Sequence, residues 1–142
     1  MGLDQAMDIS VSAINANRIN MELISSNLAN INTTRTEQGG PYRRKIAVFG
    51  EKPLQFSDAL SAAQKKMPGG IEIEDIVEDP TPFQKVYNPG HPDADSQGYV
   101  SLPNVSMAKE MVDMVYVEKV YEANITAFNA TKKMATDTLS IQ

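Results

Sequence analysis

The sequence predicts a mainly α fold with a β insertion. A long helix at each end of the chain forms one half of a coiled-coil-like pair, and a small antiparallel β and loop region lies between them. Residues 3–32 and 104–139 carry long amphipathic patterns, and all strand-like and turn-like segments fall between these stretches. With 42% hydrophobic residues, 6% aromatic residues and no tryptophan, the chain of 142 residues favours helix seams over one large core. Long helices at both ends also favour assembly, because terminal segments fray unless something holds them.

Residues 1–33 are expected to form the N-terminal helix. A seam of large apolar residues recurs in it at heptad spacing. This seam consists of Met7, Ile14, Met21 and Leu28, with Leu3, Ser10, Asn17, Ile24 and Ile31 interleaved. A second stripe runs through Ile9, Ala13, Ala16, Asn20, Leu23 and Asn27. One partner helix cannot cover both stripes, so the pattern predicts more than one neighbour.

The end of this helix is marked by a run of serine, asparagine and threonine, whose side chains compete with helical backbone hydrogen bonds. The helix is therefore expected to stop near residues 30–33, with Asn27, Asn30 and Thr33 as the helix-end motif. Asparagines in an apolar stripe could select register and partner, or they could simply face solvent. For Asn27 and Asn30, plain capping of the helix is an equally open alternative.

Residues 34–103 are expected to form a small antiparallel sheet or a pair of hairpins, which is too little for an independent domain. Alternating apolar and polar residues predict strands at 42–49, 71–78, 83–87 and 99–102. Turn residues fill 34–41, and the composition of residues 50–70 predicts a variable loop with at most one short helix.

Two features of this insertion could carry chemistry, and a structural interpretation is favoured for both. Asp93 and Asp95 precede Gly98 as at the start of a calcium loop, but the twelfth position is Asn104 instead of a bidentate glutamate. A turn is therefore favoured. His91 is the only histidine, and a metal or acid–base role would need converging partners. Since cysteine is also absent, the sequence predicts no catalytic residue, no metal ligand, no cofactor and no enzymatic activity.

Charge and hydropathy argue against several classes of partner. A net charge of -5 and a pI near 4.8 argue against nucleic acid, which is bound by a clustered basic surface. The basic run Arg43-Arg44-Lys45 could touch phosphate or lipid head groups, but a solvated strand end is favoured. No stretch is apolar enough to span a membrane, and the first residues lack the pattern of a cleavable signal peptide.

Residues 104–142 are expected to form the C-terminal helix, with Asn104 as its N-cap. Its apolar seam keeps a three-four spacing for about nine turns. The seam consists of Met107, Met111, Met114, Tyr121, Ile125, Phe128, Ala135 and Leu139. A neighbouring stripe of valine and alanine again widens the apolar face beyond one partner. Glu118 and Lys132 lie within the seam and would need partners from another helix.

Several motifs resemble those of a known family. The run Ser26-Asn27-Leu28-Ala29-Asn30-Ile31-Asn32-Thr33 is similar to the N-terminal signature of bacterial flagellar rod and hook proteins. Four further runs resemble the FlgC-type proximal rod members of that family. They are Tyr87-Asn88-Pro89-Gly90-His91-Pro92-Asp93-Ala94-Asp95, Gly98-Tyr99-Val100, Pro103-Asn104-Val105 and Glu110-Met111-Val112. The resemblance extends over essentially the whole chain, and residues 50–70 match least.

The resemblance implies a structural subunit of the flagellar basal-body rod, the drive shaft that crosses the periplasm and transmits torque. In this family the terminal helices pack with those of neighbouring subunits into a helical tube around the export channel. The implied partners are other copies of the chain, other rod and axial proteins and the flagellar type III export apparatus. Export without a cleavable signal peptide is implied too, with no nucleic acid and no direct membrane insertion.

Large apolar seam positions are expected to form the subunit interface. They are Met7, Ile14, Met21, Ile24, Leu28, Met111, Tyr121, Ile125 and Phe128. Because each helix carries two apolar stripes, one chain alone is not expected to cover them, and helix ordering should be coupled to assembly. The alternative is a generic helical adaptor or coiled-coil assembly protein without a flagellar role. Such a protein would use similar seams but would not require the Asn-Leu-Ala-Asn helix end or the run at 87–95.

Overall fold

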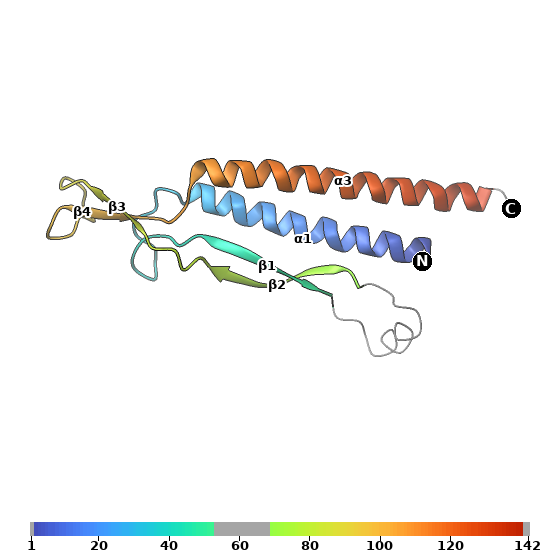
Figure 1. Cartoon of the computed structure of the whole chain (residues 1–142), viewed down its shortest axis with the longest axis horizontal. Coiled ribbons are helices and arrows are strands. Elements are labelled where there is room, and N and C mark those ends of the chain that lie inside the picture. The colour runs from blue at the N-terminus through green and yellow to red at the C-terminus, as the bar shows by residue number, and fades with distance from the viewer. Residues whose placement is uncertain (1, 53–68, 141–142) are drawn as a thin grey trace.

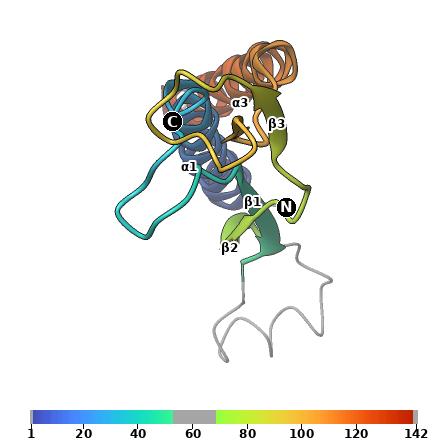
Figure 2. The same cartoon turned by 90° about the vertical axis from the view of Figure 1, so that its left-hand side faces the viewer.

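Two long antiparallel helices form the body of the chain, with one β-hairpin along their side and a second at one end (Figure 1). The computed structural model describes residues 2–52 and 69–140, in which the elements follow in the order α1, β1, β2, β3, β4, α3. Helix α3 and the β1–β2 hairpin lie on opposite sides of α1 (Figures 1 and 2). The predicted fold class, terminal helices with a small antiparallel β region between them, is confirmed.

Helix α1 spans Leu3–Ala29 and is covered on every face except one. From Asp4 onward its exposed residues form a single row at three-four spacing, which we call the exposed row of α1. The row is Asp4, Asp8, Val11, Asn15, Arg18, Glu22, Ser25 and Ala29. The expectation that one chain cannot cover two stripes is therefore wrong for α1, because the hairpin supplies a second partner on the side away from α3.

The C-terminal end of α1 lies where the sequence predicts it. Asn30 is the C-cap residue, and both its backbone N–H and its side-chain Nδ2 donate to the carbonyl oxygen of Ser26, at 3.1 and 2.8 Å. Thr33 Oγ1 donates to Asn30 Oδ1 at 3.2 Å. Short polar side chains thus take over the hydrogen bonds of the last turn, and the predicted stop near residues 30–33 is confirmed.

Strands β1 (Lys45–Glu51) and β2 (Ile71–Glu78) form an antiparallel hairpin that runs along α1. At one end Asn27 binds the first residue of β1, and at the other Ser12 Oγ accepts the N–H of Ile71 at 3.1 Å. Between those two residues the helix rises about 22 Å. A strand of this length spans about 23 Å, so helix and hairpin match in length.

Strand β2 has the predicted bounds, but β1 begins at Lys45 instead of at residue 42. The backbone before Lys45 is bonded elsewhere: Tyr42 N donates to Thr33 O at 3.0 Å, and Arg44 N donates to Asn104 Oδ1 at 2.8 Å. The sequence predicts a variable loop at residues 50–70. Of that stretch, residues 53–68 lie outside the described residues.

The second hairpin pairs β3 (Gln84–Tyr87) with β4 (Tyr99–Leu102), close to the predicted bounds. The paired rings of Tyr87 and Tyr99 meet edge to face, with centroids 5.3 Å apart. Gly98 precedes β4 with a φ of +79°, and a Cβ there would lie 3.0 Å from the Tyr87 ring. Only glycine therefore fits this turn.

Helix α3 spans Met107–Ser140, and the predicted start at Asn104 is wrong. Glu110 N donates to Ser106 O at 2.9 Å, which closes the first turn, whereas the side chain of Asn104 binds backbone groups of other segments. The covered residues of α3 lie along one side of the helix. They are Glu110, Asp113, Met114, Val117, Val120, Tyr121, Asn124, Ile125, Phe128, Thr131 and Ala135. From the predicted seam, Met107, Met111 and Leu139 are exposed.

Candidate assembly interface

A cluster of polar side chains joins the end of α1, the start of β1 and the first turns of α3. We call it the polar junction, and it consists of Asn27, Tyr42, Arg44, Asp79, Asn104, Glu110 and Asp113. Asn27 and Glu110 are its most deeply buried members, with exposed fractions of 1% and 0%. Polar groups buried to this extent are tolerated only when they are hydrogen-bonded.

The side-chain amide of Asn27 uses all of its hydrogen-bonding capacity in this junction. Its Nδ2 donates to Glu110 Oε2 at 3.0 Å and to Lys45 O at 2.9 Å. Its Oδ1 accepts the N–H of Lys45 at 2.9 Å and the hydroxyl of Tyr42 at 3.0 Å. The chemistry of these partners determines the orientation of the amide, since a backbone N–H only donates and a carboxylate only accepts. Asn27 thus links α1 to both β1 and α3.

Arg44 pairs with the carboxylates that the fold brings together here. Its Nε lies 2.6 Å from Glu110 Oε1, its Nη2 lies 3.3 Å from Asp113, and its Nη1 lies 3.7 Å from Asp79. The Arg44 side chain is only 11% exposed, so solvent screens these pairs little. Glu110 also lies in the first turn of α3, where the helix dipole favours a negative charge. One cation therefore holds three carboxylates from two segments.

Asp79 closes the junction at the end of β2. Its backbone N–H donates to Arg44 O at 2.8 Å, and its carboxylate accepts both the hydroxyl and the N–H of Thr81. The Thr81 hydroxyl, the Thr81 N–H and the charges of Arg44 and Lys109 together hold the pKa of Asp79 below its ordinary value of 3.8, against the opposing effect of burial.

Replacing Thr81 with valine is expected to raise the pKa of Asp79 toward its ordinary value, because valine has no hydroxyl to donate. A carboxyl whose pKa is lower in the folded state contributes stability above its ordinary pKa, and loses that contribution as pH falls through the folded value. T81V should therefore gain less stability than the parent as pH rises from about 2 to 5.

NMR titration of the Asp79 carboxyl carbon measures this shift, and Asp95 is the internal control. The pKa of Asp95 is lowered chiefly by the N–H of Tyr99 and also by that of Gln97, neither of which T81V touches. An unchanged Asp79 pKa in T81V would show that the hydroxyl is not the cause.

The structure corrects the interpretation of the basic run Arg43-Arg44-Lys45 as a solvated strand end. Arg44 lies inside the polar junction, and Arg43 stacks on Phe83 with its guanidinium carbon 4.4 Å from the ring centroid. The alternation that predicted a strand from residue 42 gave no indication of these partners, which are distant in sequence. The roles of Arg44 and Glu110 were missed for the same reason.

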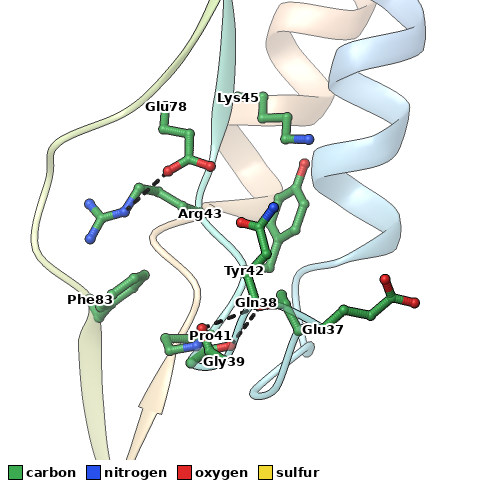
Figure 3. A pocket seen from close by; sticks show the side chains of 11 residues that line it. Glu37, Gln38, Gly39, Pro41, Tyr42, Arg43, Lys45, Glu78 and Phe83 are labelled. Atoms are coloured by element: carbon green, nitrogen blue, oxygen red, sulfur yellow. Dashed lines mark hydrogen bonds and ion pairs between the residues drawn. The ribbon is translucent and has the colours of Figure 1, made fainter.

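An open pocket of about 500 Å³ adjoins the junction (Figure 3). The turn at residues 36–41 forms one side of it, and Arg43, Glu78 and Phe83 lie on the other. Arg43 Nε is 3.9 Å from Glu78 Oε2, so these two charged groups of the lining pair with each other. The pair ties the segment before β1 to the end of β2, which is a structural role.

Around residues 88–98 the described chain forms turns, as the sequence predicts. Asp95 Oδ1 accepts the N–H groups of Gln97 and Tyr99 at 2.8 and 2.9 Å. Asp93 accepts the hydroxyl of Thr34 at 2.8 Å, and its N–H donates to Nδ1 of His91 at 3.1 Å. These aspartates thus hold the loop closed and anchor it to the segment that follows α1.

Most residues expected at the subunit interface are at least partly covered within the chain. Ile24 is buried, and Met7, Ile14, Met21, Leu28, Tyr121, Ile125 and Phe128 are partly buried. Met111 is 55% exposed and is the one exposed residue of the predicted set. In the helix-end motif, Asn30 and Thr33 bind locally, whereas Asn27 links three elements. Their contacts with other subunits stay a prediction.

The first half of α3 presents an exposed apolar surface. Its residues are Met107, Met111, Val112, Val115 and Tyr116, with exposed fractions from 53% to 70%. Neighbours at i, i+3 and i+4 adjoin on a helix, so these side chains form a continuous patch. Soluble monomers rarely leave such patches uncovered. The polar junction holds the first turns of α3, which carry this patch, against α1 and β1.

No helix among residues 2–52 and 69–140 is long and apolar enough to cross a membrane. Two family models match the chain: one described as "Flagella basal body rod protein" over residues 7–35, and one described as "Flagellar basal body rod FlgEFG protein C-terminal" over residues 96–141. The first segment contains Asn27 and the second contains Glu110, so the polar junction joins the two matched regions.

Curated proteins similar to this chain include three named "Flagellar basal-body rod protein FlgC". The one from Bacillus subtilis (strain 168) is 43% identical over 96% of this chain and 95% of its own length. That from Borreliella burgdorferi is 36% identical, with 99% and 98% covered. That from Aquifex aeolicus (strain VF5) is 37% identical, with 94% and 92% covered.

Proposed function

Because this chain belongs to the family of FlgC-type flagellar basal-body rod proteins, we propose that it is a structural subunit of the proximal rod. In this role it polymerises with other axial proteins into the tubular drive shaft that transmits torque and surrounds the export channel. The observation that carries the proposal on the chain itself is the exposed apolar patch on α3, which a neighbouring subunit can cover.

The small core of the chain supports the same role. Among residues 2–52 and 69–140 the buried apolar residues are Ala13, Ala16, Ile24, Tyr42, Ala47, Val100, Val105 and Val117. Only the last of them belongs to α3, a helix of 34 residues. A helix so long draws most of its stability from packing, which this chain supplies on one side of it. Assembly provides the remaining burial.

The partners in this proposal are other copies of the chain and other rod and axial proteins. The subunit travels through the flagellar type III export apparatus and is incorporated into the rod that spans the periplasm. Neither a cofactor nor a chemical reaction enters the proposal, since packing alone performs the function.

A deletion strain complemented with the parent gene or with Met111→Glu tests the function. Deletion should abolish rods and motility, and the parent gene should restore both. Met111→Glu should fail to restore them, because a charge would be buried in a subunit contact. The monomer should remain folded, since Met111 is exposed. Intact basal bodies in the deletion strain, seen by electron cryo-tomography, would refute the rod function.

The dilute monomer is expected to order its helices only in part. Helix α1 has partners on both sides, so the second half of α3 should fray first. Hydrogen exchange should therefore be faster at residues 123–140 than at 110–121. Circular dichroism should show less helix than the 27 and 34 residues of α1 and α3. Full helix content with one sharp melt would show instead that ordering does not depend on assembly.

A further inference from the structure

One exposed row of α3 combines lysine with small and apolar residues, and we call it the lysine face. It consists of Lys109, Val112, Tyr116, Lys119, Ala123, Thr126, Ala130 and Lys133, all exposed and at three-four spacing. Within these bounds the row carries no acidic residue. Lys119 pairs with Glu122 of the adjoining row at 2.8 Å, yet both side chains remain more than half exposed. The lysine face is therefore basic and apolar, although the chain as a whole is acidic.

Strand β2 has the opposite character. Its acidic residues are Glu72, Glu74, Asp75 and Glu78, all of them exposed, and it carries no basic residue. Ile71, Ile76 and Val77 are exposed beside them. The structure pairs Glu78 with Arg43 at 3.9 Å. The β1–β2 hairpin thus presents an acidic and aliphatic surface.

These two complementary surfaces cannot meet within one chain, because the hairpin lies on the far side of α1 from α3 (Figure 2). Their lengths nevertheless correspond. Glu72 and Glu78 are about 20 Å apart along the strand, and Lys119 and Lys133 are about 21 Å apart along the helix. Hairpin and helices also run along the same direction in Figure 1. A copy placed beside the first, without a large rotation, would set strand against helix lengthwise.

We propose that the β1–β2 hairpin of one copy binds along the lysine face of α3 in a neighbouring copy. This inference rests on the proposed function, since it names a contact by which copies of the subunit join. Lys119 lies opposite Glu78 and Lys133 lies opposite Glu72 of the other copy, and this register sets Ile76 beside Ala123.

The contact joins two different patches, so it is head-to-tail and leaves each copy with one free surface of each kind. Contacts of this kind build open helical assemblies unless the rotation closes a ring. Exposed ion pairs contribute little affinity, so the apolar residues supply the binding and the charges select the register. The alternative partner for either surface is a different axial protein, and the experiments below separate the two.

Charge reversal tests the pairing. Lys119→Glu with Lys133→Glu, and separately Glu72→Lys with Glu74→Lys, should each lower the number of rods per cell by about tenfold or more, since like charges oppose each other across the contact. A chain with all four changes should recover most of the loss, because every copy then carries both reversed surfaces. Recovery supports contact between copies. Four changes that behave no better than two would overturn it, and so would double variants that behave like the parent.

Crosslinking tests whether the two surfaces lie close together in the rod. Because the chain contains no cysteine, only the introduced thiols react. A chain with Ile76→Cys and Ala123→Cys, treated in isolated basal bodies with a short bismaleimide, should form a ladder of covalent oligomers. Each single variant should form none, and a mixture of the two should stop at dimers. Ile76→Cys combined with Val11→Cys, on the exposed row of α1, is the matched control.

The outcomes also separate this inference from the proposed function. If isolated basal bodies lack the protein, the rod function itself fails. If they contain it and the Ile76→Cys/Ala123→Cys chain gives no more ladder than the control, the rod function stands and the hairpin contact is wrong. Crosslinks from these sites only to another axial protein would likewise overturn the contact between copies.

Discussion

Replacing Arg44 with leucine is expected to destabilise the folded chain by about 3 to 5 kcal/mol, because Glu110 would stay buried without its cation. Asp79 and Asp113 would lose their shared partner as well. This is a large part of the stability of a domain, typically about 5 to 15 kcal/mol. Urea unfolding followed by circular dichroism measures the loss, and strains that carry R44L should lose motility on warming.

Two further variants identify the cause. Arg44→Leu combined with Glu110→Leu should be more stable than R44L alone, because the unpaired buried charge is gone. Arg18→Leu is the matched control, since the Arg18–Glu22 pair is exposed on α1 and should contribute less than about 1 kcal/mol. If R44L costs no more than R18L, the buried pair does not anchor α3.

Replacing Asn27 with leucine is expected to cost about 2 to 4 kcal/mol, because several buried groups lose their partner at once. The N–H and C=O of Lys45 and the hydroxyl of Tyr42 would be left without Asn27, and Glu110 would lose a donor. Leucine also cannot join α1 to β1, so the hairpin should loosen. Faster hydrogen exchange at Ile46 and Ala47 would report this directly.

Asn17→Ala is the matched control, because Nδ2 of Asn17 binds only Ala13 O within its own helix and alanine favours helix. Its effect should be small. Asn27→Asp keeps the shape but sets a second carboxylate against Glu110, so its stability should rise as pH falls toward about 4. An N27D variant that matches the parent at neutral pH would contradict the assigned hydrogen bonds.

Most element types were predictable because they follow from local pattern. The heptad spacing of Met7, Ile14, Met21 and Leu28 predicted a helix, and alternation at residues 71–78 predicted a strand with the observed bounds. The short polar side chains of the helix-end motif predicted the stop of α1. Where prediction failed, a distant partner had taken over the local group: Asn104, expected to cap α3, binds the N–H of Arg44 instead.

The polar junction was predictable only in part. A buried, paired role for Asn27 was one of two open alternatives, whereas Arg44 was taken to be solvated. A charge run gives no local sign of its partners, and Arg44 meets Glu110 only because α1, β1 and α3 converge. In the same way, the second stripe of α1 predicted another neighbour but not that a hairpin of the same chain would provide it.

The sequence alone thus determined the helices, the strands, the helix end and the need for more than one partner, because periodicity and side-chain hydrogen bonding act over a few residues. Tertiary structure alone decided which stripes are covered within the chain, which sides of α3 remain exposed, and how Arg44, Asn27 and Glu110 pair. These outcomes depend on contacts between residues far apart in sequence, and burial and charge pairing are settled only when those residues meet.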